Sequence, residues 1–191
     1  MGYDLLGGLF FAALTPLVIL GFVVFWIMTS RERRHVEDTW ETFAARRVRE
    51  YVPARGEWPN RSSPGVRWTH DDVVYELTAL GVEANARTRL GARPRGRILG
   101  SFVLRPAATP DVSEQPAGLS TRVLDDATRR AFLGFRQRDD VVLAYRRGRV
   151  TLEWPGRECN DARIDEAERV VTAVVHAVEA AFRDAGRRMA S

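Results

Sequence analysis

Residues 141–154, VVLAYRRGRVTLEW, give the clearest β-pattern in the chain. Apolar side chains recur at every second position on both sides of Arg147 and Gly148, which is typical of strands that bury one face. The alternating apolar positions are Val141, Leu143, Tyr145, Val150, Leu152 and Trp154. A short connection that contains glycine joins neighbouring strands in a tight turn. The stretch therefore predicts an antiparallel hairpin.

Two further pairs of strands are predicted upstream of this hairpin. Residues 66–68 and 73–77 alternate apolar and polar side chains on either side of the polar turn THDD. Residues 82–90 and 97–106 flank GARPRG, a turn punctuated by glycine and proline. Both pairs are typical of hairpins. By contrast, residues 106–118 contain three prolines and no apolar period, so we expect an exposed loop there.

Three segments carry apolar residues at helical spacing. Residues 31–53 predict an amphipathic juxtamembrane helix that Pro53 ends, residues 124–135 a short helix, and residues 164–183 a long helix. The helix at 31–53 has acidic residues on its polar face, which favours docking on the following domain over docking on a bilayer. Together these elements predict an α+β fold. We expect a compact domain at 54–191 with a largely antiparallel sheet of about six strands, covered by two or three helices.

Residues 1–30 are predicted to form a single transmembrane helix ahead of this domain. Residues 5–28 are 24 consecutive residues without a charge, and the core of a bilayer needs about 20 in helical form. No small-residue cleavage site follows, so the segment reads as a retained anchor. Arg31, Arg33 and Arg34 come directly after it and resist translocation. We therefore expect a single-pass protein of the cell inner membrane, with its N-terminus outside and its C-terminal domain in the cytoplasm.

Composition narrows the classes of partner. The chain has 191 residues and a formal net charge of +4, and all 29 basic residues are arginine, as a GC-rich bacterial genome would produce. Acidic residues are interspersed among the arginines, which is typical of a solvated mixed surface and argues against a nucleic-acid partner. The single cysteine, Cys159, excludes an internal disulfide.

Arginines are densest between residues 87 and 97. Anionic lipids attract basic side chains that lie near a membrane surface. This predicts contacts with the lipid bilayer for a set that includes the flank of the anchor: Arg31, Arg33, Arg34, Arg87, Arg89, Arg93, Arg95 and Arg97. The competing interpretation is a strand at the edge of the sheet whose charges prevent edge-to-edge aggregation.

Two short stretches carry groups that enzymes use. His70, Asp71 and Asp72 combine an imidazole with carboxylates, but a polar β-turn is the simpler interpretation. Cys159 precedes the long C-terminal helix, where a thiol can become more acidic, although an ordinary cysteine is the simpler interpretation again. No phosphate-binding loop, metal-ligand motif or nucleophile motif occurs in the sequence, so we predict no cofactor and no metal, and catalysis is not favoured.

The sequence thus favours a membrane-anchored protein with a cytoplasmic protein-interaction module, acting as an adaptor or accessory subunit of another protein. One alternative is a membrane-tethered enzyme or small-ligand-binding domain that uses His70, Asp71, Asp72 or Cys159. A second alternative is a sensor of anionic lipid surfaces. Gly8 and Ala12 are spaced for close helix approach, which is compatible with a homodimer.

Overall fold

The computed structural model describes residues 3–56, 62–81, 85–105, 111–135, 140–157 and 160–189. Within these ranges the side chains of residues 3–13, 29, 32, 33, 36, 111, 188 and 189 are outside the description. The chain divides into two compact units, Met1–Thr39 and Trp40–Ser191. Each unit is described by itself.

The first unit is helical. Helix α1 (Tyr3–Arg46) begins there and its last residues belong to the second unit. Between Leu14 and Met28 its large apolar side chains are 39–67% exposed. Within the described residues, no helix combines the length and the apolar character that crossing a bilayer requires. The transmembrane helix predicted for residues 1–30 is therefore not supported by the described residues, and the side chains of Leu5–Ala13 lie outside them.

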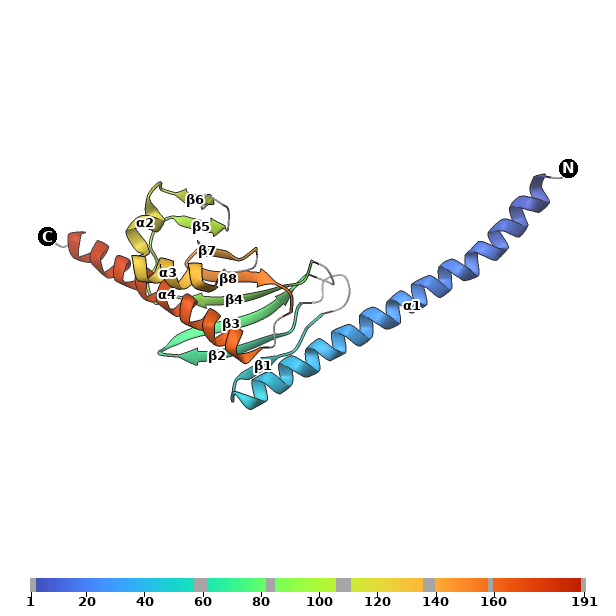
Figure 1. The fold of residues 1–191 in the computed structure, drawn as a ribbon, viewed down its shortest axis with the longest axis horizontal. Coiled ribbons are helices and arrows are strands. Elements are labelled where there is room, and N and C mark those ends of the chain that lie inside the picture. Colours follow the sequence, from blue (N-terminus) through green and yellow to red (C-terminus); the bar gives the residue numbers. More distant parts are fainter. Residues whose placement is uncertain are drawn as a thin grey trace. The chain divides into compact units, whose positions relative to one another are not determined.

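The described residues of the second unit form one eight-stranded sheet in which all paired neighbours are antiparallel (Figure 1). The order of strands across the sheet is β1-β2-β3-β4-β8-β7-β5-β6. The strands are β1 (Glu50–Val52), β2 (Gly65–His70), β3 (Val73–Leu80), β4 (Arg87–Arg93), β5 (Ser101–Arg105), β6 (Asp111–Gln115), β7 (Val142–Arg146) and β8 (Arg149–Pro155). The α+β class and the antiparallel sheet are confirmed.

The strand count differs from the predicted six because both edge strands were missed. Strand β1 lies where helical periodicity runs on toward Pro53, but α1 ends at Arg46 and the chain turns at Val48, whose φ is 53°. Strand β6 lies in the proline-containing stretch that predicts a loop. An edge strand pairs on one side through backbone groups alone, so it needs no apolar alternation. The division of the chain at 1–30, 31–53 and 54–191 stays a prediction.

Residues 141–154 form the predicted hairpin, in which β7 pairs with β8 and Arg146 faces Arg149. Arg147 and Gly148 have φ of 53° and 73°, as a tight two-residue turn requires. The predicted pairing of 82–90 with 97–106 is wrong. Strand β4 pairs with β3 and β8, whereas β5 pairs with β6 and β7, so the β7–β8 hairpin lies between them. A turn-like sequence marks where the chain leaves a strand and does not determine its next neighbour.

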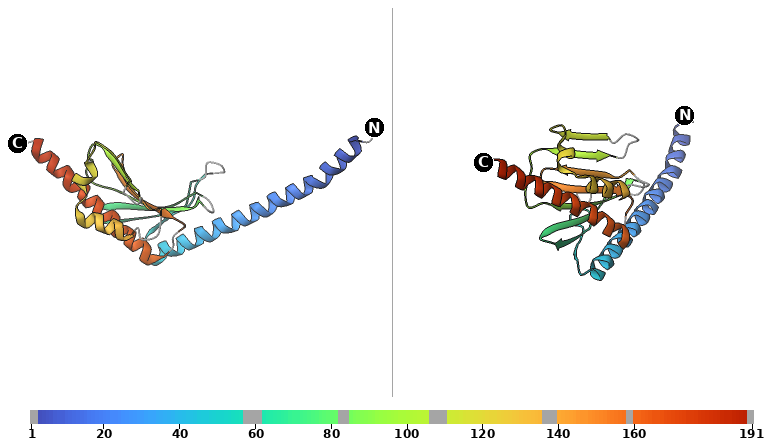
Figure 2. Two further views of the ribbon diagram at one scale, coloured as in Figure 1. Left: turned by 45° about the horizontal axis from the view of Figure 1, so that its top comes forward. Right: turned by 60° about the vertical axis from the view of Figure 1, so that its left-hand side comes forward.

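Three helices cover one face of the sheet: α2 (Leu119–Val123), α3 (Asp126–Phe135) and α4 (Asp161–Met189) (Figure 2). The side of α4 that packs on the sheet is formed by Ile164, Ala167, Val170, Val171, Val174, Val175 and Val178, all at most 2% exposed. Facing strand residues such as Tyr75, Leu90 and Leu152 are fully buried. The opposite face of the sheet, here called the open face, is covered by no helix among the described residues of the second unit.

Candidate functional site

The open face carries arginines at alternate positions of its central strands. On β4, Thr88, Leu90 and Ala92 are buried toward the helices. Successive side chains of a strand point to opposite faces, so Arg89 and Arg93 belong to the open face. Charged side chains thus stand on the side of the sheet that no described helix covers.

Three of these arginines share one row across three neighbouring strands. Arg146 of β7 is the pairing partner of Arg149 of β8. Ala92 of β4 pairs with Val150 of β8, and continuing that register by one residue puts Arg93 opposite Arg149. Residues directly opposite each other in antiparallel strands have side chains on the same face, and like charges so placed repel. The sequence therefore concentrates positive charge at one end of β4, β8 and β7.

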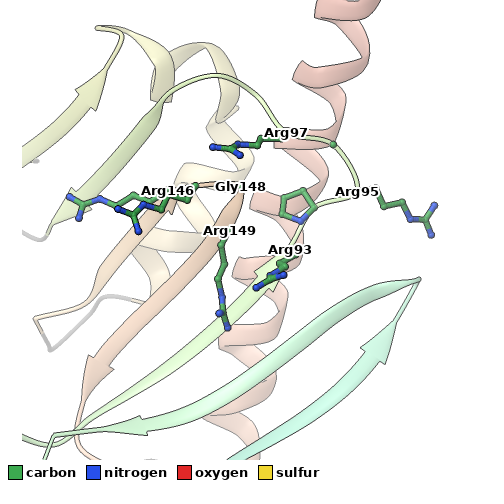
Figure 3. Close-up of a pocket in the computed structure, with 9 residues that line it drawn as sticks. Arg93, Arg95, Arg97, Arg146, Gly148 and Arg149 are labelled. Atoms are coloured by element: carbon green, nitrogen blue, oxygen red, sulfur yellow. The ribbon is translucent and has the colours of Figure 1, made fainter. Parts of the chain in front are cut away.

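These residues border a cavity of about 510 Å³, here called the arginine cavity. Its lining comes from the end of β4 with the following connection and from the β7–β8 turn: Arg93, Pro94, Arg95, Gly96, Arg97, Arg146, Arg147, Gly148 and Arg149. Figure 3 shows the side chain of Arg149 running across β4 beside that of Arg93, and that of Arg97 beside Gly148. Arg95 points away, and Arg146 lies on the side opposite Arg95. Six arginines thus line the cavity.

Only part of this charge is neutralised. Arg149 Nη2 donates to Glu76 Oε2 at 2.5 Å, and Arg95 pairs with Asp72. Among the described residues no ion pair or hydrogen bond involves the other four guanidinium groups, which belong to Arg93, Arg97, Arg146 and Arg147. The arginine cavity is therefore strongly electropositive.

Two glycines make room for this arrangement. A Cβ on Gly91 would lie 2.7 Å from Arg149 Nε, so the missing side chain lets Arg149 cross β4 and reach Glu76 on β3. A Cβ on Gly148 would lie 3.2 Å from Arg97 Cδ. Gly148 therefore serves both the turn and the close approach of Arg97.

The connection that carries Arg97 is held by Tyr145. The Tyr145 hydroxyl donates to the Ile98 carbonyl at 3.2 Å and accepts from the Ile98 amide at 3.1 Å. Tyr145 is fully buried, and burial raises the pKa of its hydroxyl, while the hydrogen bond to Ile98 acts in the opposite direction. A buried neutral phenol thus fixes the backbone next to Arg97.

Within the second unit, the arginines predicted as membrane contacts do not form one cluster. Arg87 pairs with Asp140 at 2.9 Å and Arg89 with Glu153 at 2.7 Å, both half-buried. At about 3.3 Å per strand residue, Arg87 lies roughly 20 Å along β4 from Arg93. Arg31 and Arg34 are exposed residues of the first unit, and the Arg33 side chain is outside the description.

Sequence reasoning missed Arg146, Arg147 and Arg149 as companions of Arg93 and Arg97. Their signal was the run YRRGR at residues 145–149, which also fits an ordinary charged turn. Only the order of strands, with β8 beside β4, brings the run next to residues 93–97. Long-range strand pairing leaves no local pattern from which this neighbourhood could be read.

His70, Asp71 and Asp72 form the hairpin turn between β2 and β3. Asp71 and Asp72 have φ of 49° and 60°, and His70 Nε2 lies 3.5 Å from Asp71 Oδ2. Asp72 is engaged by Arg95, and Cys159 lies outside the described residues. Within the described ranges no three side chains of His, Cys, Asp or Glu are grouped as metal ligands would be. The described part of this predicted site is therefore a polar turn.

A second cavity, of about 500 Å³, runs along the start of α4 beside His70. The acidic side chains that line it already form hydrogen bonds that hold the domain together. Asp165 accepts hydrogen bonds from both Nη atoms of Arg47, at 2.8 and 2.9 Å. Glu168 accepts hydrogen bonds from Arg49 Nη2 at 2.8 Å and from Trp68 Nε1 at 3.0 Å. These contacts join the segment that follows α1, and strand β2, to α4. Of the predicted catalytic groups, His70 alone lines this cavity among the described residues.

Known proteins resemble this chain in fold but not in sequence. No family model matches the chain, and no curated protein matches it. A solved structure that does match is the crystal structure of the mycobacterial trehalose monomycolate transport factor A, TtfA. The TM-score is 0.60 at 11% sequence identity, and the match covers 75% of this chain and 94% of that one. At this identity the likeness concerns the fold, so this chain shares its α+β architecture with that transport factor.

Proposed function

We propose that this chain is a membrane-associated accessory protein whose α+β domain binds another protein. The observation that carries the proposal is the exposed apolar surface of α1. Its exposed side chains are Leu14, Leu17, Val18, Ile19, Leu20, Phe22, Val23, Val24, Phe25, Trp26, Ile27 and Met28. A helix that is apolar on all sides is normally buried in protein or in lipid. Contiguous exposed apolar surface of this kind marks a site of interaction.

In the proposed arrangement the N-terminal apolar segment inserts in the cell inner membrane as a single pass. Arg31, Arg33 and Arg34 would hold the following residues on the cytoplasmic side. The N-terminus would then lie outside and the α+β domain inside. Arg87, Arg89, Arg93, Arg95 and Arg97 are proposed contacts with the membrane surface in this arrangement.

The accessory role is supported by the fold and by its neighbour. The neighbour is a mycobacterial trehalose monomycolate transport factor, and we extend to this chain only the idea of an accessory factor in transport. The open face of the sheet offers a broad surface with charged residues to a protein partner. The rival enzymatic role has less support. Of the predicted catalytic groups that the structure describes, His70, Asp71 and Asp72 form a turn, and His70 alone lines a cavity.

Membrane association is tested with the full chain expressed in bacteria. We expect the wild type in the membrane pellet after carbonate washing. Replacing Val18 and Val24 together by aspartate should release it, since each aspartate costs about 2.5–3.5 kcal/mol at a bilayer centre. The matched control is Leu133→Asp, because Leu133 is an exposed apolar residue of the second unit at 48% exposure. The control should stay in the pellet, and wild type in the soluble fraction would contradict the proposal.

Orientation is tested with reporters fused to the C-terminus. A reporter active only in the cytoplasm should be active, and one active only in the periplasm should be silent. Periplasmic activity would overturn the proposed placement of the domain. Crosslinking in intact membranes, followed by identification of the product, then tests for the protein partner.

A further inference from the structure

The geometry points to the arginine cavity as a binding site for a phosphate-bearing anion, either a lipid headgroup or a soluble phosphate compound. The inference goes beyond the proposed accessory role, because a domain with no membrane contact could also bind such an anion. It rests on the presence of Arg93, Arg97, Arg146, Arg147 and Arg149 in the lining of one cavity.

Electrostatic repulsion within the cavity is the first argument. Among the described residues, Glu76 is the one carboxylate that pairs with any of these five arginines, and it pairs with Arg149. The row of Arg93, Arg149 and Arg146 sets like charges opposite one another on three strands. Such a row opposes folding unless counter-ions or a ligand compensate it. An anion bound in the cavity would relieve the repulsion.

Protection of a sheet edge does not account for these charges. Charged side chains blunt aggregation when they stand on an edge strand. Here β4, β8 and β7 are interior strands, each paired on both sides, and the edges are β1 and β6. The row of arginines therefore stands where pairing with a second molecule is already blocked by neighbouring strands.

The donor set matches phosphate chemistry. Arginine presents a planar fork of N–H groups that fits the oxygens of a phosphate in a bidentate manner. Several such forks around a cavity of about 510 Å³ leave room for a group larger than one phosphate, such as a diphosphate or a glycerophosphate headgroup. A single carboxylate ligand would leave most of the donors unused.

The fold also positions the donors in advance. Gly91 leaves the space that the Arg149 side chain occupies, and Arg149 is held at its far end by Glu76. Tyr145 fixes the backbone at Ile98, beside Arg97. Donors held in place before binding lose less conformational entropy when the ligand arrives.

The test uses the full chain in neutral detergent micelles, so that any contact of α1 with detergent is constant. In one arm, isothermal titration measures binding of sodium pyrophosphate as a probe of soluble phosphate compounds. In the other arm, the protein is equilibrated with equal amounts of phosphatidylglycerol and phosphatidylcholine, repurified, and analysed for retained lipid. We expect saturable binding in at least one arm, and the arm that responds identifies the source of the phosphate.

The variant that tests the site replaces Arg93 and Arg146 by glutamine. Neither residue has an ion pair among the described contacts, so the fold should persist, and circular dichroism checks this. The matched control replaces Arg183 and Arg187, two exposed residues of α4, and removes the same charge. We expect the Arg93/Arg146 variant to lose at least tenfold in affinity and the control to lose less than twofold. If the Arg93/Arg146 variant misfolds, a double variant with Arg97→Gln and Arg147→Gln is tested in its place.

Two results would overturn the inference. One is the absence of saturable pyrophosphate binding together with equal retention of the two lipids by the wild type. The other is an equal loss of affinity in the Arg183/Arg187 control, which would show attraction to net charge instead of a site. Pyrophosphate binding alone assigns a soluble ligand, retention of phosphatidylglycerol alone assigns a headgroup, and both together support a site that accepts either.

Discussion

Arg49 shows how one side chain joins three elements. Its guanidinium lies 3.8 Å from the centre of the Trp68 ring and pairs with Glu168 at 2.8 Å. Only 10% of the Arg49 side chain and 17% of the Glu168 side chain are exposed, so solvent screens the pair weakly. The same Glu168 accepts from Trp68 Nε1. The residue thus fastens the chain after α1 to both β2 and α4.

We therefore expect Arg49→Ala to lower the free energy of unfolding by about 3 kcal/mol, because it leaves a largely buried carboxylate without its partner. Urea unfolding of the full chain in detergent, followed by tryptophan fluorescence, measures the change. Arg46→Ala is the control, since Arg46 is 57% exposed and its pair with Asp161 should contribute less than about 1 kcal/mol. Equal losses in the two variants would show that burial does not set the strength of these pairs.

Glu114 gives a prediction about pH. Its carboxylate accepts from the Gly118 amide and from the Ser120 amide at 2.8 Å, and so caps the start of α2. Hydrogen bonds from Ser120 are the largest cause that lowers the pKa of Glu114 below its ordinary value of 4.5. A group whose pKa is lowered by folding stabilises the fold above its ordinary pKa, and that contribution is lost as pH falls toward the folded value.

The difference in stability between the wild type and Glu114→Gln should accordingly be constant above about pH 6 and shrink as pH falls below about 4.5. Thermal unfolding of both proteins at a series of pH values measures it. A difference that stayed the same down to pH 3 would show that the charged form of Glu114 is not what α2 requires.

Helix α4 is the element that the sequence predicted best. Its apolar stripe between Ile164 and Val178 is long and strictly periodic, so the helix and its buried side could both be read from the pattern. The start could not, because Asn160, Asp161 and Asp165 are all residues of types that commonly cap helices. In the structure the cap is Asn160, whose Oδ1 accepts from the Ala162 amide at 2.9 Å.

Asn160→Ala should therefore lower the free energy of unfolding by about 1 kcal/mol, because an amide at the start of α4 loses its acceptor. Asn160→Asp keeps an acceptor at the same place and should retain most of the stability. Chemical unfolding of the two variants beside the wild type separates the cap from any general effect at this position. A larger loss for aspartate than for alanine would contradict the assignment.

At the scale of the whole molecule, the six strands with apolar alternation could be predicted, and the two edge strands could not. β6 has no alternating apolar residues to reveal it, and β1 lies where helical periodicity continues past the end of α1 at Arg46. The arginine cavity could not be predicted either, since Arg93 and Arg149 are 56 positions apart and only the pairing of β4 with β8 joins them. Local patterns report on local structure, and pairing between distant strands depends on the packing of the complete sheet.

The second unit should fold without the N-terminal segment. Its core, including Trp40 at 1% exposure and Phe43 at 2%, belongs to residues after Thr39. Removing residues 1–34 keeps the last turns of α1 and should leave a cooperative thermal transition by circular dichroism. A non-cooperative melt of the shortened chain would show that the second unit depends on the N-terminal segment for its stability.

The position of the β7–β8 hairpin between β4 and β5 also has a consequence during synthesis. The ribosome completes β4 at residue 93, but the strand that will lie beside it ends only at residue 155. Until then β4 is a temporary border of the nascent sheet, open to pairing with other chains. Arg87 and Arg89 stand on that border, and their charges would keep neighbouring nascent chains apart until β8 arrives with Glu153 as their counter-charge.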